Sequence, residues 1–477
     1  MRCKNKGLID AFLMRLEAGW CKRATHIVCC HDEFLYLSRR QLGYAAPIWN
    51  SPPDAYPMIQ NYLCVMVCFP WKCNAMQNKP VVLLVAEAVT LAHFGRIATL
   101  AKALDSSVYQ VAVASDPRYA DLEPALGCKF YPIRSISSAQ FIRALNRGRP
   151  LYSTATLIQY VEDDLMLLDS VKPNLVIGDF RLSLAVSAPL RKIPYTTVVN
   201  AYWSPFADIP YLVPDLPITR ALGLSLAQKL FDIVRPIVFA QHARPLNRVR
   251  SRYGLPSLGP DLRNVYTGGD YTLYADAPQV IPIHNLPPNH YYLGPVLWST
   301  HTPLPDWWDY LPRDKPIIFL TFGSSGQSNL LPLALEALSQ LQATVMVATL
   351  GKIKIARVPA NTYITEYLNV DIAIQHSQLA ICNGGSLTVY QALAHGVPVI
   401  GLCSNMDQLL NMSAVERLGA GLALRAARVT QTQLKEAARD ILETTAYAQA
   451  AAQVQKHLKQ IDARERFRTF VARILDE

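Results

Sequence analysis

The sequence has little of what marks a membrane-spanning, metal-binding or nucleic-acid-binding protein. Only 17% of its 477 residues are charged. The longest apolar run of the first 75 residues, YLCVMVCF, is far shorter than the about 20 residues that a spanning helix needs. Lys and Arg give a formal net charge of +10, but they are scattered and form no long basic run. The composition therefore predicts a globular protein that does not bind nucleic acid.

Cysteine is scarce after residue 75. Only Cys128, Cys382 and Cys403 lie in that part of the chain, each in an apolar context, as expected of buried thiols in a reducing cytosol. The start of the chain has no continuous apolar segment ending in small residues, as a signal peptide would have. No Asp/His or Cys/His set has the spacing of metal ligands. We therefore expect a cytoplasmic protein with no metal and no other cofactor.

Residues 1–75 differ in composition from the rest of the chain. They hold seven of the ten cysteines and three of the seven tryptophans, without a sustained helical or strand period. Met76 then opens MQNKPVVLLVAEAV, a typical start for a protein that begins with a buried strand. We predict that Met76 is the true initiator and that residues 1–75 are an artefact of start assignment or a disordered extension. The alternative is a small Cys-rich accessory module, and the intact mass of the native protein distinguishes the two.

From Met76 onward, short apolar runs alternate with helical patterns. PVVLLVA, YQVAVAS, PNLVIGD and IPYTTVVN are typical of strands buried on both faces, and RIATLAKALD has helical spacing. A Pro- and Trp-rich stretch follows residue 291, and a second alternating block begins at IIFLTFGSS. The pattern predicts an α/β protein of two Rossmann-like, doubly wound parallel-sheet domains that face a cleft. The expected divisions are 76–295, a linker at 296–315, 316–460, and a C-terminal helix at 461–477 that packs back on the first domain.

Two strands of the second block end in Gly-rich turns that lead into helices. These turns are TFGSSG at 321–326 and CNGGSLT at 382–388. Glycine lets the backbone approach a ligand, and the N–H groups of a helix N-terminus favour anions. The two turns could hold the two ends of a diphosphate, although TFGSSG alone is more often a plain turn. Asp407-Gln408, at the end of the next strand, suits vicinal sugar hydroxyls, or Asp407 is a helix N-cap.

These motifs resemble the nucleotide-sugar-dependent glycosyltransferases of the GT-B fold, close to the UDP-glycosyltransferases and the bacterial macrolide group. TFGSS is similar to that family's SFGS turn. NGGSLTVYQALAHGVPVIGLCSNMDQ is similar to its longer and more specific HGGxGT…DQ segment. The resemblance covers about 400 residues, from Met76 to the end. It implies a donor site in the second domain, with the sugar held by Asp407 and Gln408. It implies that the diphosphate is held by Gly323, Ser324, Ser325, Asn383, Gly384, Gly385, Ser386 and Thr388.

The resemblance also implies an acceptor site in the first domain. AHFGR, residues 92–96, occupies the place of the family's GHxxP, so that His93 matches the base that activates the acceptor. Asp179 matches the carboxylate that orients this histidine. From the residues alone, a single His after a strand is more often structural, and a strand-end Asp equally suits a helix cap.

The chain departs from the family pattern at several positions. Asn383 stands where the family has histidine, and an amide stabilises a leaving diphosphate less than a charged ring does. Leu387 replaces a glycine, and Ala92 and Arg96 replace the Gly and Pro around His93. YLNV, residues 367–370, stands where many members have Trp-x-Pro-Gln, which leaves the donor base open between uridine, thymidine and another base.

The sequence thus predicts an inverting, metal-independent glycosyltransferase that moves a sugar from a UDP- or dTDP-sugar to a hydroxyl of a small apolar acceptor. The alternatives are a lipid-linked or cell-wall GT-B enzyme, a nucleotide-sugar epimerase, and a non-catalytic nucleotide-sugar-binding protein. The cations of FIRALNRGR (Arg143, Arg147 and Arg149) permit a weak peripheral membrane contact, although such a face is more often merely solvated. We expect a monomer or a weak dimer.

Overall fold

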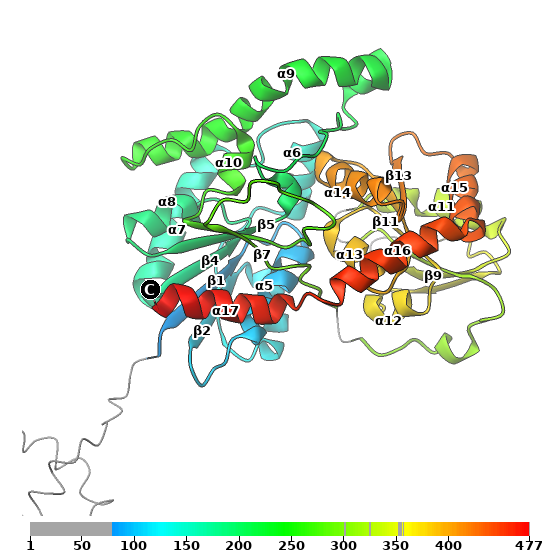
Figure 1. Ribbon diagram of the computed structural model, residues 1–477, viewed down its shortest axis with the longest axis horizontal. Helices are drawn as coiled ribbons and strands as arrows, with labels where there is room; N and C mark the ends of the chain where they lie inside the picture. The colour runs from blue at the N-terminus through cyan, green and yellow to red at the C-terminus, as the bar shows by residue number, and fades with distance from the viewer. Residues whose placement is uncertain (1–78, 300–301, 324–325, 352–354, 356, 477) are drawn as a thin grey trace, which may run out of the picture. The chain divides into compact units, whose positions relative to one another are not determined.

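The computed structural model describes residues 79–299, 302–323, 326–351, 355 and 357–476. The predictions for residues 1–75, and those for Ser324 and Ser325, lie outside the described residues. The described chain contains two parallel sheets with helices around them (Figure 1).

The first sheet has seven strands in the order β3-β2-β1-β4-β5-β6-β7, and every described pair is parallel. Its strands are β1 (Val81–Ala86), β2 (Gln110–Ser115), β3 (Lys129–Pro132), β4 (Leu175–Asp179), β5 (Tyr195–Val199), β6 (Tyr271–Tyr274) and β7 (His290–Tyr292). The helices of this part are α5 (Leu91–Ala103), α6 (Ser138–Asn146), α7 (Thr154–Val171), α8 (Leu184–Leu190), α9 (Pro217–Arg252) and α10 (Leu262–Tyr266). The apolar run of β1 is buried because helices cover both faces of the sheet.

The second sheet has six strands in the order β10-β9-β8-β11-β12-β13, also parallel. Its strands are β8 (Ile317–Thr321), β9 (Thr344–Ala348), β10 (Thr362–Thr365), β11 (Leu379–Cys382), β12 (Val399–Cys403) and β13 (Gly421–Arg425). Its helices are α11 (Leu331–Ser339), α12 (Val370–Gln375), α13 (Ser386–Ala394), α14 (Met406–Arg417), α15 (Gln431–Glu443) and α16 (Thr445–Leu458). Together the two sheets confirm the predicted doubly wound α/β architecture.

The strand order of both sheets reverses beside their first strand. β1 has β2 on one side and β4 on the other, and β8 has β9 and β11. The loops after these central strands therefore diverge to opposite faces, which leaves a crevice at the carboxyl ends of the strands. The residues that follow β1, β4, β8 and β11 are thus the ones that the fold places for ligand binding.

The last helix, α17 (Ala463–Asp476), returns to the first sheet and lies beside α5 (Figure 1). Its Phe467 and Val471 are fully buried in the same core as α5, and Phe470 contacts the rings of Tyr271 and Tyr291. Its apolar positions recur at helical spacing, so one face is buried while the other stays polar. Among the described helices, none has both the length and the apolarity needed to cross a bilayer.

Candidate functional site

His93 lies in the first turn of α5, which begins at Leu91. The helical spacing seen in the sequence began at Arg96, whereas the helix begins five residues earlier and includes Gly95. Gly95 is required there by packing, since a Cβ at this position would lie 2.6 Å from the ring of Trp298. His93 is therefore part of a regular helix, which fixes its backbone near the carboxyl end of β1.

His93, Arg96 and Asp179 form one hydrogen-bonded group. His93 Nδ1 lies 2.8 Å from Asp179 Oδ1. Arg96 donates to the same carboxylate through Nε, 2.6 Å from Oδ2, and through Nη2, 3.1 Å from Oδ1. The guanidinium also lies 3.3 Å from His93 Nδ1. The structure thus brings the predicted base and its carboxylate together, although 86 residues separate them in the chain.

Asp179 is not a helix cap, which corrects the alternative drawn from the sequence. The N-cap of the following helix, α8, is Ser183. Burial raises the pKa of Asp179, but the charges of Arg96 and His93 and their hydrogen bonds outweigh it and hold the pKa below 3.8. The carboxylate is therefore charged at neutral pH. A proton on His93 Nδ1 satisfies this acceptor and leaves Nε2 as the nitrogen that can take a proton.

A second buried polar group extends from Arg96 toward the other sheet. Arg96 Nη1 donates to Asn200 Oδ1 at 3.2 Å, and Asn200 Nδ2 donates to Asp276 Oδ2 at 3.1 Å. Tyr390 of α13 donates to Asp276 Oδ1 at 2.8 Å. Sequence reasoning missed this group, because its members lie at separate strand ends and share no motif. Arg96, noted only as a departure from the family pattern, was the one signal.

A cluster of aromatic rings lies beside His93. Phe180, whose backbone has a positive φ of 60°, stacks on the His93 ring with centroids 5.1 Å apart. A positive φ is uncommon for a bulky residue and persists only where the surrounding structure holds it. Here the preceding residue, Asp179, is held by hydrogen bonds to His93 and Arg96. Phe141, Tyr152 and Tyr266 contact Phe180 in turn. The base therefore faces an apolar, aromatic environment.

A fully buried ionic cluster lies beneath the Phe180 turn. Arg181 contacts Glu87 Oε2 at 3.0 Å and Asp164 Oδ1 at 2.9 Å, and its guanidinium lies over the ring of Tyr160. Burial raises the pKa of both carboxyls above their ordinary values, against the opposing charge of Arg181. Because Glu87 follows β1 and Arg181 follows β4, this cluster ties together the two strand ends that carry the catalytic candidates.

In the second sheet, Gly323 and Asn383 follow the adjacent strands β8 and β11. Gly323 has φ 58°, and a Cβ built on it would lie 3.9 Å from Asn383 Oδ1. Asn383 is buried and accepts a hydrogen bond from the N–H of Gly385 at 3.2 Å. The two Gly-rich turns therefore lie side by side, as two ends of one diphosphate site would require.

The second turn is shaped by glycine. Gly384 has φ 79°, and a Cβ there would lie 2.8 Å from Met412 Cγ and 2.9 Å from Cys403 Sγ. Gly385 is the N-cap of α13 and has no side chain to occupy the orphan N–H groups. Ser386 and Thr388 lie in the first turn of α13, both partly exposed.

Asp407 and Gln408 lie in the first turn of α14, after the end of β12. The N-cap is Asn405, which accepts from the N–H of Gln408, so the reading of Asp407 as the N-cap was wrong. Asp407 Oδ1 accepts a hydrogen bond from Trp203 Nε1 at 2.8 Å. Gln408 is buried, and its Oε1 accepts from the N–H and the hydroxyl of Ser404. Only Asp407 of this pair therefore faces the first sheet.

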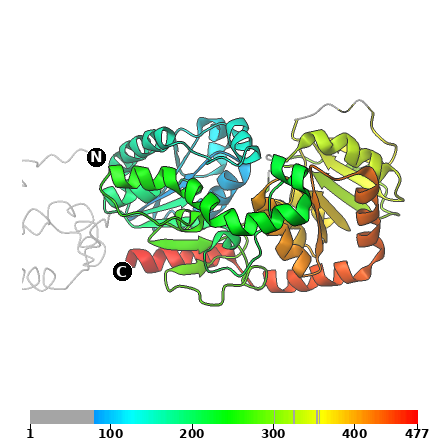
Figure 2. The same cartoon turned by 90° about the horizontal axis from the view of Figure 1, so that it is seen from above.

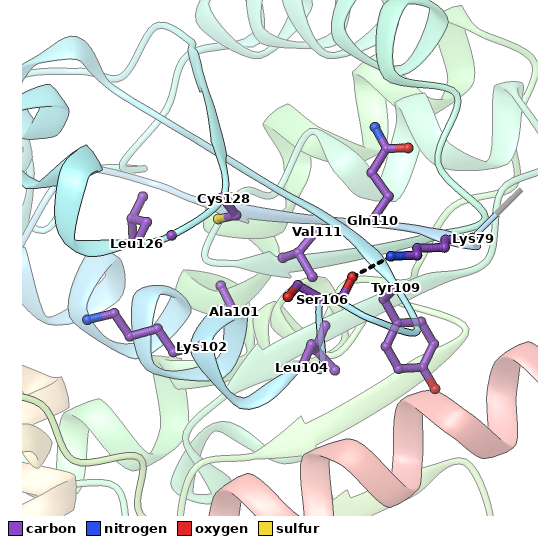
Figure 3. A pocket seen from close by; sticks show the side chains of 11 residues that line it. Lys79, Ala101, Lys102, Leu104, Ser106, Tyr109, Gln110, Val111, Leu126 and Cys128 are labelled. Carbon is purple, nitrogen blue, oxygen red and sulfur yellow. Dashed lines mark hydrogen bonds between the residues drawn. The ribbon is translucent and has the colours of Figure 1, made fainter. Parts of the chain in front are cut away.

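Two hollows formed by described residues lie in different places. A cavity of about 490 Å³, lined by Lys79, Lys102, Ser106 and Tyr109 among others, opens at the amino ends of β1 and β2 (Figure 3). Parallel sheets bind ligands at the opposite ends of their strands, and this cavity holds no candidate residue. A smaller hollow between α5 and α13 is lined by Arg96, Ser386 and Tyr390. Within the described ranges, no group of three or more His, Cys, Asp or Glu side chains is arranged to hold a metal.

Comparison with known proteins shows the family of the chain. Residues 333–462 match the family model "Erythromycin biosynthesis protein CIII-like, C-terminal domain". The chain is 48% identical over 373 residues to the PGL/p-HBAD biosynthesis rhamnosyltransferase of Mycobacterium bovis (strain BCG / Pasteur 1173P2), covering 78% of this chain and 83% of the relative.

Two solved structures share the fold. Spinosyn forosaminyltransferase SpnP superposes with a TM-score of 0.63 at 18% identity, covering 84% of this chain and all of the neighbour. Spinosyn rhamnosyltransferase SpnG, solved in complex with thymidine diphosphate, gives a TM-score of 0.59 at 18% identity, covering 82% and 99%. Given the 48% identity across most of its mycobacterial relative, the chain belongs to the PGL/p-HBAD biosynthesis glycosyltransferase family and is a glycosyltransferase of the GT-B fold.

Proposed function

We propose that the protein transfers a sugar, with inversion, from a nucleoside diphosphate to a hydroxyl of a small apolar acceptor. The observation that carries the proposal is the His93–Asp179 pair, at 2.8 Å, at the carboxyl ends of β1 and β4. The name of the mycobacterial relative supports rhamnose as the sugar, and the ligand of SpnG supports thymidine diphosphate as the carrier. Uridine diphosphate is the alternative carrier.

The transfer step needs one base and no covalent intermediate. His93 Nε2 takes the hydroxyl proton while the acceptor oxygen forms its bond to the anomeric carbon. The bond from that carbon to the diphosphate oxygen breaks, and its electron pair leaves with the nucleoside diphosphate. Attack on the face opposite the leaving group inverts the anomeric centre. Asp179 then stabilises the positive charge that His93 acquires.

Arg96 holds the carboxylate that orients the base. Its guanidinium pairs with both oxygens of Asp179 and lies 3.3 Å from His93 Nδ1. The carboxylate is thereby fixed against the His93 ring. Arg96 thus acts as a positioning residue for the base through Asp179.

The donor side needs no metal in this proposal. The leaving diphosphate would lie against the turns of Gly323 and Asn383, at the N-terminus of α13, where the helix carries about half a positive charge. Asp407 faces the first sheet and would bind the hydroxyls of the sugar.

The acceptor would enter over the aromatic rings. Phe180 stacks on the base. The centroid of the Tyr266 ring lies 5.5 Å from that of Phe180 and 5.0 Å from that of Trp203, so the three rings form one aromatic group. Such rings favour an acceptor that presents its hydroxyl on an apolar or aromatic body.

The test is transfer from dTDP-rhamnose and UDP-sugars to a panel of aliphatic and aromatic alcohols, followed by mass spectrometry. His93→Gln should lower turnover by about 10²–10⁴-fold. Calorimetry should show unchanged binding of dTDP or UDP. The matched control is His457→Gln, an exposed histidine of α16, which should have no effect. Unchanged turnover of His93→Gln would refute the role of this residue as base.

A further inference from the structure

The long helix α9 presents apolar side chains to solvent. Leu226, Leu230, Ile233 and Ile237 recur at helical spacing, and we name them the exposed stripe. Ile233 is 75% exposed and Ile237 is 62% exposed. Figure 1 shows α9 along the upper edge of the molecule, and Figure 2, seen from that side, shows it in front. Soluble proteins seldom leave so regular an apolar face open to water.

The fold itself does not account for the exposed stripe. The opposite face of α9 supplies the core contacts, since Phe231, Phe239, Ala243 and Leu246 are buried. The helix is therefore held by one apolar face and leaves much of a second apolar face open to solvent. An apolar partner would cover this exposed face of α9.

The surroundings of the exposed stripe are basic. The α9 segment 217–252 contains seven Lys and Arg but only one acidic residue, Asp232. Lys229, Arg244 and Arg248 are exposed, and no described carboxylate pairs with them. The charge therefore favours an anionic partner.

A second basic segment lies against the same helix. The turn after α6 contacts α9, since the carbonyl oxygen of Gly148 lies 3.3 Å from His242 Nε2. Arg143, Arg147 and Arg149 are exposed on this segment and pair with no described acid. The sequence indicated these three arginines as a possible membrane contact. In the structure they lie at the end of α6 and in the turn after it, and this turn contacts α9.

A continuous series of ring contacts leads from the buried side of α9 to the base. Phe239 contacts Tyr211, and Tyr211 contacts Trp203. Trp203 contacts Tyr266, which continues to Phe180 and His93. Because Phe239, Tyr211 and Tyr266 are buried, these rings join α9 to the acceptor side of the site as one packed apolar cluster.

We propose that α9, with the Arg143–Arg149 segment, docks the enzyme on an anionic lipid surface. The exposed stripe would enter the headgroup region, and the surrounding cations would contact lipid phosphates. This inference rests on the proposed function, because docking brings an apolar acceptor to His93. It names the source of the acceptor as a bilayer rather than the aqueous phase.

The test is sedimentation of the full chain with vesicles. Vesicles of phosphatidylcholine mixed with phosphatidylglycerol should bind the protein at least about tenfold more tightly than phosphatidylcholine alone. Salt at about 1 M, where the Debye length is about 3 Å, should weaken the binding. Ile233→Ser/Ile237→Ser should reduce the binding at least tenfold, while the control Val358→Ser, at an exposed apolar residue of the loop before β10, should not.

The basic segment is tested separately. Arg147→Ala/Arg149→Ala should weaken binding to the anionic vesicles and reduce its salt dependence. The control Arg439→Ala/Lys459→Ala removes two exposed cations elsewhere and should leave binding unchanged.

Two outcomes would overturn the proposal. One is absence of binding to either vesicle. The other is a protein whose exposed stripe is covered by a second copy, so that Ile233→Ser/Ile237→Ser converts a dimer to a monomer without changing sedimentation with vesicles. Transfer to a water-soluble acceptor is measured in parallel. Vesicle binding without any transfer would contradict the proposed function alone, and transfer without vesicle binding would contradict the docking alone.

Discussion

Arg96 donates hydrogen bonds to both carboxylate oxygens of Asp179, at 2.6 and 3.1 Å. This pair, more than His93 alone, sets the charge of the site. The lowered pKa of Asp179 means that the folded state holds this carboxylate charged to a lower pH than the unfolded state does. The stability that the pair contributes is therefore fully present above pH 3.8 and is lost as the pH falls through the lowered folded value.

Arg96→Met should lower kcat by about 10²-fold and change KM little. Methionine keeps the apolar stem but removes the two hydrogen bonds that hold Asp179, so the carboxylate no longer fixes the orientation of the His93 ring. Steady-state kinetics measures kcat and KM separately, and Arg439→Met is the matched control. An unchanged kcat would contradict the positioning role of Arg96.

Gly384→Ala should destabilise the protein by about 1–3 kcal/mol and weaken donor binding, because its Cβ would collide with Met412 and Cys403 at a positive φ. Gly127→Ala is the control, since Gly127 also has a positive φ, of 70°, but nothing within 4 Å of a Cβ. Denaturation by urea and calorimetry with dTDP measure the two effects. Equal losses in both variants would show that backbone conformation alone, and not packing of the turn, is responsible.

Asn383→His should tighten the binding of a nucleoside diphosphate. A protonated ring adds a charge-assisted hydrogen bond to the diphosphate, worth about 1.5–3 kcal/mol, where the amide offers a neutral one. Calorimetry with dTDP and UDP at two pH values measures the gain, which should be larger at the lower pH. Weaker binding at both pH values would count against a diphosphate site at this turn.

Arg181→Met should destabilise the protein by about 3–5 kcal/mol near neutral pH, because Glu87 and Asp164 are then buried without their cation. Both carboxyls have raised pKa values when folded, so the folded state takes up protons at a higher pH than the unfolded state. The loss should therefore shrink as the pH falls toward about 5. Urea denaturation at both pH values tests this, and Arg191→Met, which breaks an exposed pair, should cost little.

The local patterns of the chain were sufficient for much of the fold. Apolar runs such as that of β1 indicate strands buried on both faces, and their alternation with helices predicts parallel sheets. The Gly-rich turns predicted a donor site after β8 and β11. The positive φ of Gly323 and Gly384 is a conformation that favours glycine, so these turns can be recognised from local sequence. These features depend on neighbours in the chain, and a sequence displays such neighbours directly.

The tertiary structure decided which distant residues meet. β1 and β4 pair in the sheet, with Ala86 opposite Asp179, and this pairing alone brings the carboxylate to His93 and Arg96. It also decided which apolar side of α9 is buried, since Phe231 and Ile233 are equally apolar in sequence but face opposite ways. A sequence records how apolar a helix face is. Whether another element covers that face depends on how segments far apart in the chain pack together, and this packing is seen only in the folded structure.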